Sequence, residues 1–281
     1  METKQFTLST KVLNMIIGVA LVILAVIFFF PIYIALINAF KTDGEMAKSM
    51  LALPKTFSFV NFQTAFAKLE FFKTTFNTAI ITVGSVVGIL FCGSLAGYKL
   101  ARTHSALSRF FYILFIASML IPFHSIMISL TKTAMTLGVK GSLHGTILIY
   151  IGLGVNMAVF LYAGFVNSIP VDLEEAAIID GCGPFKTFAY VIFPLLKPIT
   201  ATIAILDALW IWNDLLLPLL MITDADNYTL ILSANKFFGK YEADWSNILA
   251  GLLMTSLPLV IFYMFFQKHI VEGITAGAVK G

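Results

Sequence analysis

Two aspartates inside a long apolar stretch are the residues of this sequence whose chemistry most needs an explanation. Asp207 and Asp214 lie in a run from about 198 to 222 that is otherwise dominated by apolar side chains. A carboxylate inside a membrane costs roughly 2.5–3.5 kcal/mol on insertion scales, so such a residue marks a cavity or a partner. Seven residues are nearly two helical turns, and the two aspartates are therefore expected to share a helix face with Trp210.

This shared face and the neighbouring Asn213 have several interpretations. The carboxylates can line a water-filled cavity, or they can hydrogen-bond to neighbouring helices or to a second subunit. Asp207 and Asp214 can also be proton or cation sites of an ion-coupled secondary transporter. Against that alternative, the sequence shows no two-half internal repeat with paired broken helices.

No motif in the sequence indicates catalysis. It contains neither H-E-x-x-H nor G-x-S-x-G, and it lacks the phosphate-binding pattern G-x-x-x-x-G-K-[ST]. Its two Cys and four His are scattered, with no spacing typical of a metal site. We therefore predict a protein that is not an enzyme and has no catalytic or metal-binding residues and no cofactor of its own. Its energy must come from a partner or from an ion gradient.

The composition indicates the environment of these residues. Apolar residues make up 59% of the 281 positions and charged residues only 12%, against about 25% charged in a typical soluble domain. The mean hydropathy is +0.93. A net charge of +3 is too small to suggest nucleic acid as a partner. These values predict an all-α, polytopic membrane protein in contact with lipid.

The apolar residues fall into runs long enough to span a bilayer, which requires roughly 20 residues per helix. The first run is about twice the length of the apolar part of a signal peptide, so we interpret it as a retained helix. Lys and Arg counts are equal on the two sides and leave the orientation open. The six predicted spans are about 13–38, 76–98, 109–130, 145–167, 198–222 and 247–267.

Small residues in the second run predict close helix packing. Gly84 and Gly88 form one small-xxx-small pair, and Gly93 and Gly97 form another. Such pairs let helix backbones approach each other in lipid. The neighbour can be a helix of the same chain or a second subunit.

The longest polar connection between central helices covers residues 168–197. Pro170 fits the first turn of a helix, and acidic side chains follow it where the helix dipole favours anions. Gly181 can end that helix, and Pro184 can begin the next. The pattern predicts a short amphipathic helix, a tight turn and a second short helix at the membrane surface.

The spacing within this connection resembles a family signature. It reads Glu175-Ala-Ala, three residues, Gly181, nine residues, then Val191-Ile-Phe-Pro. This closely resembles the EAA signature of ABC importer permeases, in which Ile and Leu stand where this chain has Val191 and Phe193. The segments 169–181 and 193–198, Trp212-Asn-Asp and the tail from Val271 to Gly281 resemble the carbohydrate-type permeases, which include the maltose-transporter permease. The resemblance covers nearly the whole chain from residue 13.

The resemblance implies a type I ABC importer permease fold, in which this chain forms half of a heterodimeric translocation pathway for a sugar, and more specifically an oligosaccharide. The implied domains are residues 1–75 with the first span and an extracytoplasmic loop, a transmembrane core at 76–267 containing the EAA coupling segment 168–197, and a cytoplasmic tail at 268–281. Both termini would lie in the cytoplasm, with the chain in the cell membrane.

The resemblance also implies partners and sites. The partners are an ABC ATPase dimer, which hydrolyses the ATP, a paralogous second permease subunit and an extracytoplasmic sugar-binding protein. The glutamate of the signature, Glu175, would pair with a basic residue of the ATPase, and the tail would reach the same partner. The implied docking residues are Glu174, Glu175, Ala176, Ala177, Asp180, Gly181 and Pro194, with tail contacts at Thr275, Gly277 and Lys280. The candidate translocation path comprises Asp207, Trp210, Asn213 and Asp214.

Overall fold

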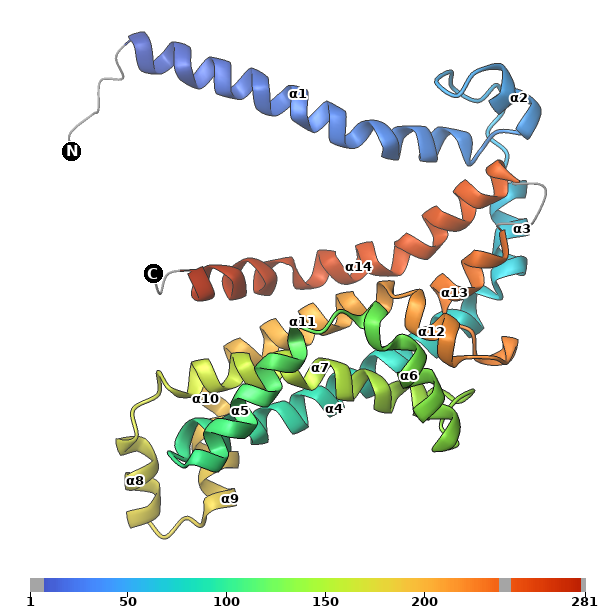
Figure 1. Cartoon of the computed structure of the whole chain (residues 1–281). Coiled ribbons are helices and arrows are strands. Elements are labelled where there is room, and N and C mark those ends of the chain that lie inside the picture. The colour runs from blue at the N-terminus through green and yellow to red at the C-terminus, as the bar shows by residue number, and fades with distance from the viewer. Residues whose placement is uncertain (1–7, 238–243, 279–281) are drawn as a thin grey trace. The chain divides into compact units, whose positions relative to one another are not determined.

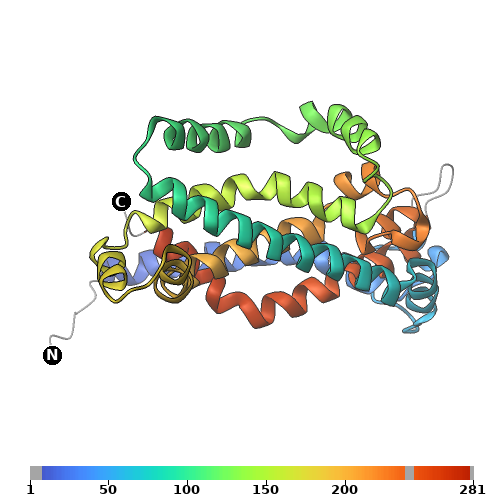
Figure 2. The ribbon, with the colours of Figure 1, turned by 90° about the horizontal axis from the view of Figure 1, so that it is seen from below.

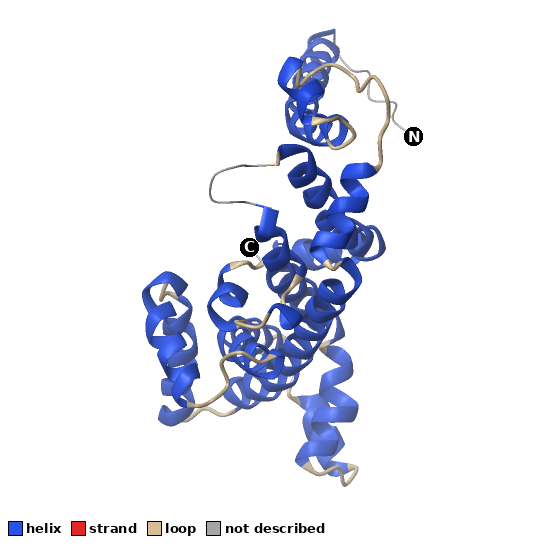
Figure 3. Cartoon of the chain, turned by 90° about the vertical axis from the view of Figure 1, so that its right-hand side faces the viewer, coloured by secondary structure: helices blue, strands red, loops and turns tan. Residues whose placement is uncertain are grey.

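The computed structural model describes residues 8–237 and 244–278, and it describes side chains within 12–265 and at residue 267. The described residues form helices, turns and loops without a strand (Figure 3). This confirms the all-α class predicted from composition. The chain divides into two units, the first comprising Met1–Leu69 with Lys236–Ser256 and the second comprising Glu70–Asn235 with Leu257–Gly281.

The first unit contains the N-terminal helix α1 (Leu8–Asn38), followed by α2 (Asp43–Lys48) and α3 (Val60–Leu69) (Figure 1). The spanning part of α1 has none of its most apolar window buried, as expected for a helix whose solvent is lipid. Lys41 is only 2% exposed. Its ammonium group donates to Asn38 Oδ1 at 2.9 Å and to the Ser49 carbonyl at 3.1 Å, so its charge is compensated by oxygen acceptors.

The second unit carries most of the remaining helices, and α14 continues from the first unit into it. The elements after α3 are α4 (Phe71–Arg102), α5 (Ala106–Met119), α6 (Phe123–Thr136), α7 (Leu143–Val166), α8 (Asp172–Ile179), α9 (Pro184–Lys186), the π-helix η1 (Thr187–Ile192), α10 (Phe193–Leu195), α11 (Lys197–Asn213), α12 (Leu216–Met221), η2 (Ala225–Asn227), α13 (Leu230–Ala234), η3 (Asn235–Phe237) and α14 (Trp245–Ala278).

Within the described residues, four helices are long and apolar enough to cross a membrane, and six spans result if each of two bent helix pairs counts as one. The run predicted at 109–130 is one of these pairs. It consists of α5 and α6, which meet at 106°. The span is sharply bent and not one continuous helix, because Pro122 caps α6, and proline cannot donate the backbone bond that a continuous helix needs.

The run predicted at 198–222 is also interrupted. Helix α11 ends at Asn213, and Asp214 follows in an extended conformation before α12 begins. The second bent pair joins the segment Pro184–Leu195 to α11 at 74°. Asp214 is therefore outside the helix that carries Asp207, and the predicted common helical face is wrong.

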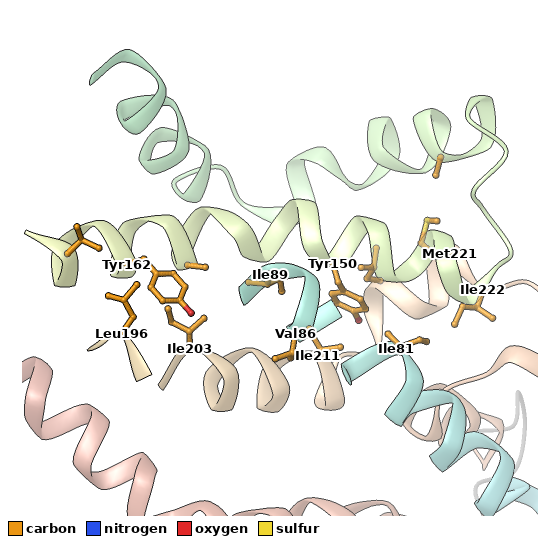
Figure 4. Close-up of a cluster of buried hydrophobic side chains, with 14 of the residues drawn as sticks. Ile81, Val86, Ile89, Tyr150, Tyr162, Leu196, Ile203, Ile211, Met221 and Ile222 are labelled. Carbon is orange, nitrogen blue, oxygen red and sulfur yellow. The ribbon is translucent and has the colours of Figure 1, made fainter. Parts of the chain in front are cut away.

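Helices α4 and α7 pack along each other (Figure 2). Gly93 and Gly97 of α4 allow the two helices to approach closely because they carry no side chain. A Cβ at Gly93 would lie 2.6 Å from Ala158 Cβ, and one at Gly97 would lie 2.6 Å from Tyr162 Cβ. Both glycines of the second small-xxx-small pair thus meet α7, a helix of the same chain. Buried side chains of α4, α7 and α11 fill the adjoining core, including Ile81, Ile89, Tyr150, Tyr162, Ile203 and Ile211 (Figure 4).

Candidate functional site

The predicted short helix of the EAA segment is α8, and it lies at the end of the second unit where α4 finishes (Figure 1). Its first turn holds Asp172, Glu174 and Glu175, an arrangement that the helix dipole favours. The helix begins at Asp172, so Pro170 lies two residues before it and not in its first turn. That detail of the prediction is wrong.

The turn after α8 requires a glycine. Gly181 has a φ of +83°, and its N–H donates to the Ile178 carbonyl at 3.0 Å. The N–H of Cys182 donates to the Ala177 carbonyl at 2.9 Å. These two bonds form a Schellman motif, in which a left-handed residue ends the helix. Pro184 then opens α9, as predicted.

One face of α8 is exposed. Glu175 and Ala176 are exposed, and Ile178 and Ile179 are 64% and 84% exposed. Phe185 in α9 is 84% exposed as well. A carboxylate surrounded by exposed apolar side chains is typical of an interaction surface. We call these five residues the outer face of α8.

The opposite face of α8 is held by the rest of the chain. Glu174 is only 8% exposed. Its carboxylate accepts a hydrogen bond from Arg102 Nε at 2.6 Å and another from the Tyr98 hydroxyl at 2.7 Å. Arg102 also donates from Nη2 to the Ile169 carbonyl at 2.8 Å. Glu174 is therefore directed into the protein, although the sequence pattern groups it with Glu175.

The other docking candidates are divided in the same way. Ala177 is buried, whereas Asp180 and Pro194 are exposed. In the tail, Thr275 and Gly277 belong to α14, and Lys280 lies outside the described residues. Sequence reasoning missed Tyr98 and Arg102. A basic residue in the last turn of a helix is too common a feature to indicate an acidic partner 72 positions away.

The four path candidates do not share one environment. Trp210 is 41% exposed, and Asn213 is exposed. Asp207 is 1% exposed, and its two oxygens have no hydrogen-bond partner among the described residues.

The Asp214 side chain stabilises the break between α11 and α12 through two hydrogen bonds. Its Oδ2 accepts from the Tyr150 hydroxyl at 2.9 Å, and its Oδ1 accepts from the Leu216 N–H at 2.9 Å. The Tyr150 ring in turn packs edge to face against Trp210, with centroids 5.5 Å apart. Two of the four candidates are thus available to a ligand, and Asp214 has a clear role in the packing.

No group of three or more His, Cys, Asp or Glu side chains in the described parts of the chain could hold a metal ion.

Comparison with known proteins places the chain in a family. Residues 89–276 match the family described as binding-protein-dependent transport system inner membrane component. The chain belongs to this family. Its members are membrane-embedded, non-enzymatic permease components that work with an ATPase and a substrate-binding protein. Family membership gives no support to the alternative of an ion-coupled secondary transporter.

Two curated relatives are similar over nearly their whole length. The probable starch degradation products transport system permease protein AmyC of Thermoanaerobacterium thermosulfurigenes is 41% identical over 264 residues, covering 92% of this chain and 94% of the relative. The melibiose/raffinose/stachyose import permease protein MelC of Bacillus subtilis is 36% identical over 267 residues, covering 95% and 96%.

A solved structure confirms the fold. A chain in the crystal structure of a bacterial ABC transporter involved in the import of the acidic polysaccharide alginate superposes with a TM-score of 0.83 at 21% sequence identity. The match covers 95% of this chain and 99% of that one. The predicted type I ABC importer permease fold is thereby confirmed.

Proposed function

We propose that this chain is a permease subunit of an ABC importer for oligosaccharides. The support for a sugar cargo comes from the relatives, whose names refer to starch degradation products and to melibiose, raffinose and stachyose. A third relative from Bacillus subtilis, 31% identical over 262 residues, is named an arabinooligosaccharides transport system permease protein.

In this proposal the chain forms half of the translocation pathway and a paralogous second permease forms the other half. Its termini and α8 lie in the cytoplasm, and an extracytoplasmic sugar-binding protein delivers the cargo on the other side. The chain binds no cofactor, because the partner ATPase hydrolyses the ATP. The functional division is the one expected from the sequence, with residues 1–75, 76–267 and 268–281 as its parts.

The observation that carries the proposal is the two-sided character of α8. The outer face presents Glu175 beside exposed apolar side chains, which suits a groove with a basic residue on the ATPase. Exposed isoleucines and an aromatic ring supply apolar contact area, and the carboxylate supplies specificity. Thr275, Gly277 and Lys280 provide a second contact with the same partner.

The cargo path is proposed to run past Trp210 and Asn213. A partly exposed indole ring stacks on the apolar face of a sugar, and an amide offers both donor and acceptor. Asn213 uses its Nδ2 for the Leu209 carbonyl at 2.8 Å, which leaves its oxygen for the cargo. Asp214 contributes indirectly, because its bond to Tyr150 supports the ring against which Trp210 packs.

Reconstitution with the partners tests the proposal. The chain, a second permease and the ATPase are co-expressed, and the complex is purified through the ATPase. Glu175→Lys is expected to reduce co-purification and sugar-stimulated ATP hydrolysis by about tenfold, because a buried interfacial charge pair becomes repulsive. Unchanged assembly and hydrolysis would refute the docking role.

A matched glycine pair checks the turn. Gly181→Ala places a side chain at a φ of +83°, whereas a Cβ at Gly183 meets no atom within 4 Å and has an ordinary φ. The first variant is expected to weaken ATPase binding because the Schellman turn orients the outer face. Gly183→Ala is expected to bind like the unmodified chain.

A further inference from the structure

We propose that Glu174, Arg102 and Tyr98 form a clamp that makes α8 and α4 move as one body, so that these three residues couple ATP hydrolysis to transport. We call them the Glu174 clamp. The inference rests on the proposed function, since it requires α8 to receive a movement from an ATPase. The clamp residues themselves face away from that partner and act as positioning residues.

The clamp holds the coupling segment at three successive points. Arg102 Nη2 binds the Ile169 carbonyl before α8, and Arg102 Nε binds Glu174 within it. Tyr98 reaches the same carboxylate, and its ring packs against Phe188 of η1 after α8, with centroids 5.2 Å apart. The last two turns of α4 therefore contact the chain before, within and after the docking helix.

Burial gives these contacts their stiffness. The side chains of Arg102 and Glu174 are 16% and 11% exposed, so water replaces their partners only at a cost. Hydrogen bonds between ionised groups are stronger than neutral ones, and a bond to a planar guanidinium also fixes orientation. Sliding α8 along α4 would leave a carboxylate and a guanidinium unpaired in a partly buried site, which is strongly unfavourable.

Two routes lead from the clamp to the proposed path. The first is α4 itself, which packs along α7 and α11. The second begins at Phe188, which contacts Tyr98 and, at 5.9 Å, Phe193 of α10. Helix α10 leads directly into α11, which carries Trp210. A displacement of α8 can thus reach the helices of the core without passing through an exposed loop.

Loss of a coupling residue lowers the amount of sugar transported per ATP hydrolysed, whereas loss of a purely structural residue lowers transport and hydrolysis in parallel. Glu174→Gln removes the charge but keeps an oxygen acceptor, and Tyr98→Phe removes one bond but keeps the ring against Phe188. Lys99→Gln is the matched control, because it removes a charge from an exposed residue at the same end of α4. All three variants are assembled with the ATPase, the second permease and the binding protein in proteoliposomes.

The readout is the amount of oligosaccharide transported per ATP hydrolysed. For Glu174→Gln we expect this ratio to fall about fivefold, the lower end of measured coupling effects. Tyr98→Phe should reduce it less, and Lys99→Gln should leave it unchanged. If transport and hydrolysis fall in parallel, or if neither changes, the clamp has no coupling role and the inference is overturned.

A distance measurement checks the mechanical claim independently of turnover. Spin labels are placed at Leu173→Cys on α8, which is not part of the outer face, and at Phe91→Cys on α4, both exposed, after replacing Cys92 and Cys182 with serine. The unmodified clamp should give one narrow distance distribution with and without ATP. Glu174→Gln should broaden it, and an equally narrow distribution in that variant would contradict the inference.

These results remain separable from a failure of the proposed function. If the unmodified chain binds no ATPase, the proposed function fails before any clamp variant is examined. If the unmodified chain binds and transports while Glu174→Gln keeps its ratio, only the clamp is refuted. If Glu174→Gln and Tyr98→Phe both fail to assemble although the chain remains folded in the membrane, the clamp is a docking support and the coupling inference is also refuted.

Discussion

The two ends of α4 are held by different kinds of interaction. At its C-terminal end, the ion pair of Arg102 with Glu174 is buried, with side chains 16% and 11% exposed. At its N-terminal end, Lys73 pairs with Glu70 and Asp226, and these three side chains are 41%, 46% and 75% exposed. The N-terminal end also uses uncharged groups that are buried.

Those uncharged groups are an amide and a hydroxyl. Asn77 Nδ2 donates to the carbonyls of Asp226 and Tyr228 at 2.8 and 3.1 Å. The hydroxyl of Thr78 accepts from the Leu230 N–H at 2.8 Å. Surface ion pairs contribute little, whereas unsatisfied buried groups cost much. The N-terminal end is therefore fixed by side chain to backbone bonds, and the C-terminal end by charge.

The largest effect is expected at the charged end. Among the described residues, Arg102→Ala leaves the Glu174 carboxylate with Tyr98 as its remaining hydrogen-bond partner. The variant should destabilise the chain by about 3 kcal/mol, as removal of one member of a buried pair does. Thermal unfolding of the purified chain in nanodiscs measures this. Lys99→Ala, on the same turn but exposed, is the control. A similar unfolding temperature for both variants would remove the distinction between the two ends.

Glycine replacements compare the packing at the C-terminal end of α4 with the packing at its middle. A Cβ at Gly97 would lie 2.6 Å from Tyr162 Cβ and 3.1 Å from the Ala163 nitrogen, whereas a Cβ at Gly84 would meet the tip of Ile147 at 3.0 Å. A backbone cannot shift as a side-chain tip can. Gly97→Ala should cost about 2 kcal/mol of stability and Gly84→Ala clearly less. The reverse order in thermal unfolding would contradict the packing described here.

At the N-terminal end, Asn77→Ala should have the next largest effect. It removes the donor for two carbonyls at a position that is 7% exposed. A loss of about 1 kcal/mol is expected, as for a typical buried hydrogen bond. Hydrogen exchange of the segment 225–230 should increase in the variant. Unchanged exchange would show that α4 does not hold this segment through Asn77.

The smallest effect is expected from the exposed ions. The ammonium of Lys73 lowers the pKa of Asp226 by hydrogen bonding and by charge. Because the folded-state pKa is the lower one, any stability from this pair is present above the ordinary pKa of an aspartate and is lost as the pH falls through the lowered value. Asp226→Asn should abolish that dependence. Added salt should weaken it as well, since exposed pairs are screened.

The sequence predicted those features that depend on local composition. Hydropathy was sufficient for α1, α4, α7 and the first part of α14, and the glycine and proline positions were sufficient for the turn at Gly181 and the start of α9. The sequence prediction missed the break after Asn213, although Pro218 lies four residues after Asp214 and its ring opposes a continuous helix there. A tertiary contact also favours the break, since Asp214 bonds to Tyr150 from another helix.

The sequence was sufficient to locate the docking segment, but it could not show which side chains of α8 are exposed and which are buried against α4. Glu174 and Glu175 are adjacent and chemically alike, so only their rotation about the helix axis separates them. That rotation is fixed by Arg102 and Tyr98, which lie more than seventy positions earlier in the chain. The docking and path residues therefore stay predictions, and the structure supplies the reason to treat Glu174 differently from its neighbour.

The most direct test compares these two neighbours. The affinity of the purified ATPase is measured for permease complexes carrying Glu175→Gln or Glu174→Gln. The outer-face variant should bind at least about tenfold more weakly than the unmodified complex, a loss of about 1.4 kcal/mol. The clamp variant should bind nearly as well as the unmodified complex. Equal losses in both variants, or a larger loss for Glu174→Gln, would contradict the assignment of one face of α8 to the ATPase and the other to α4.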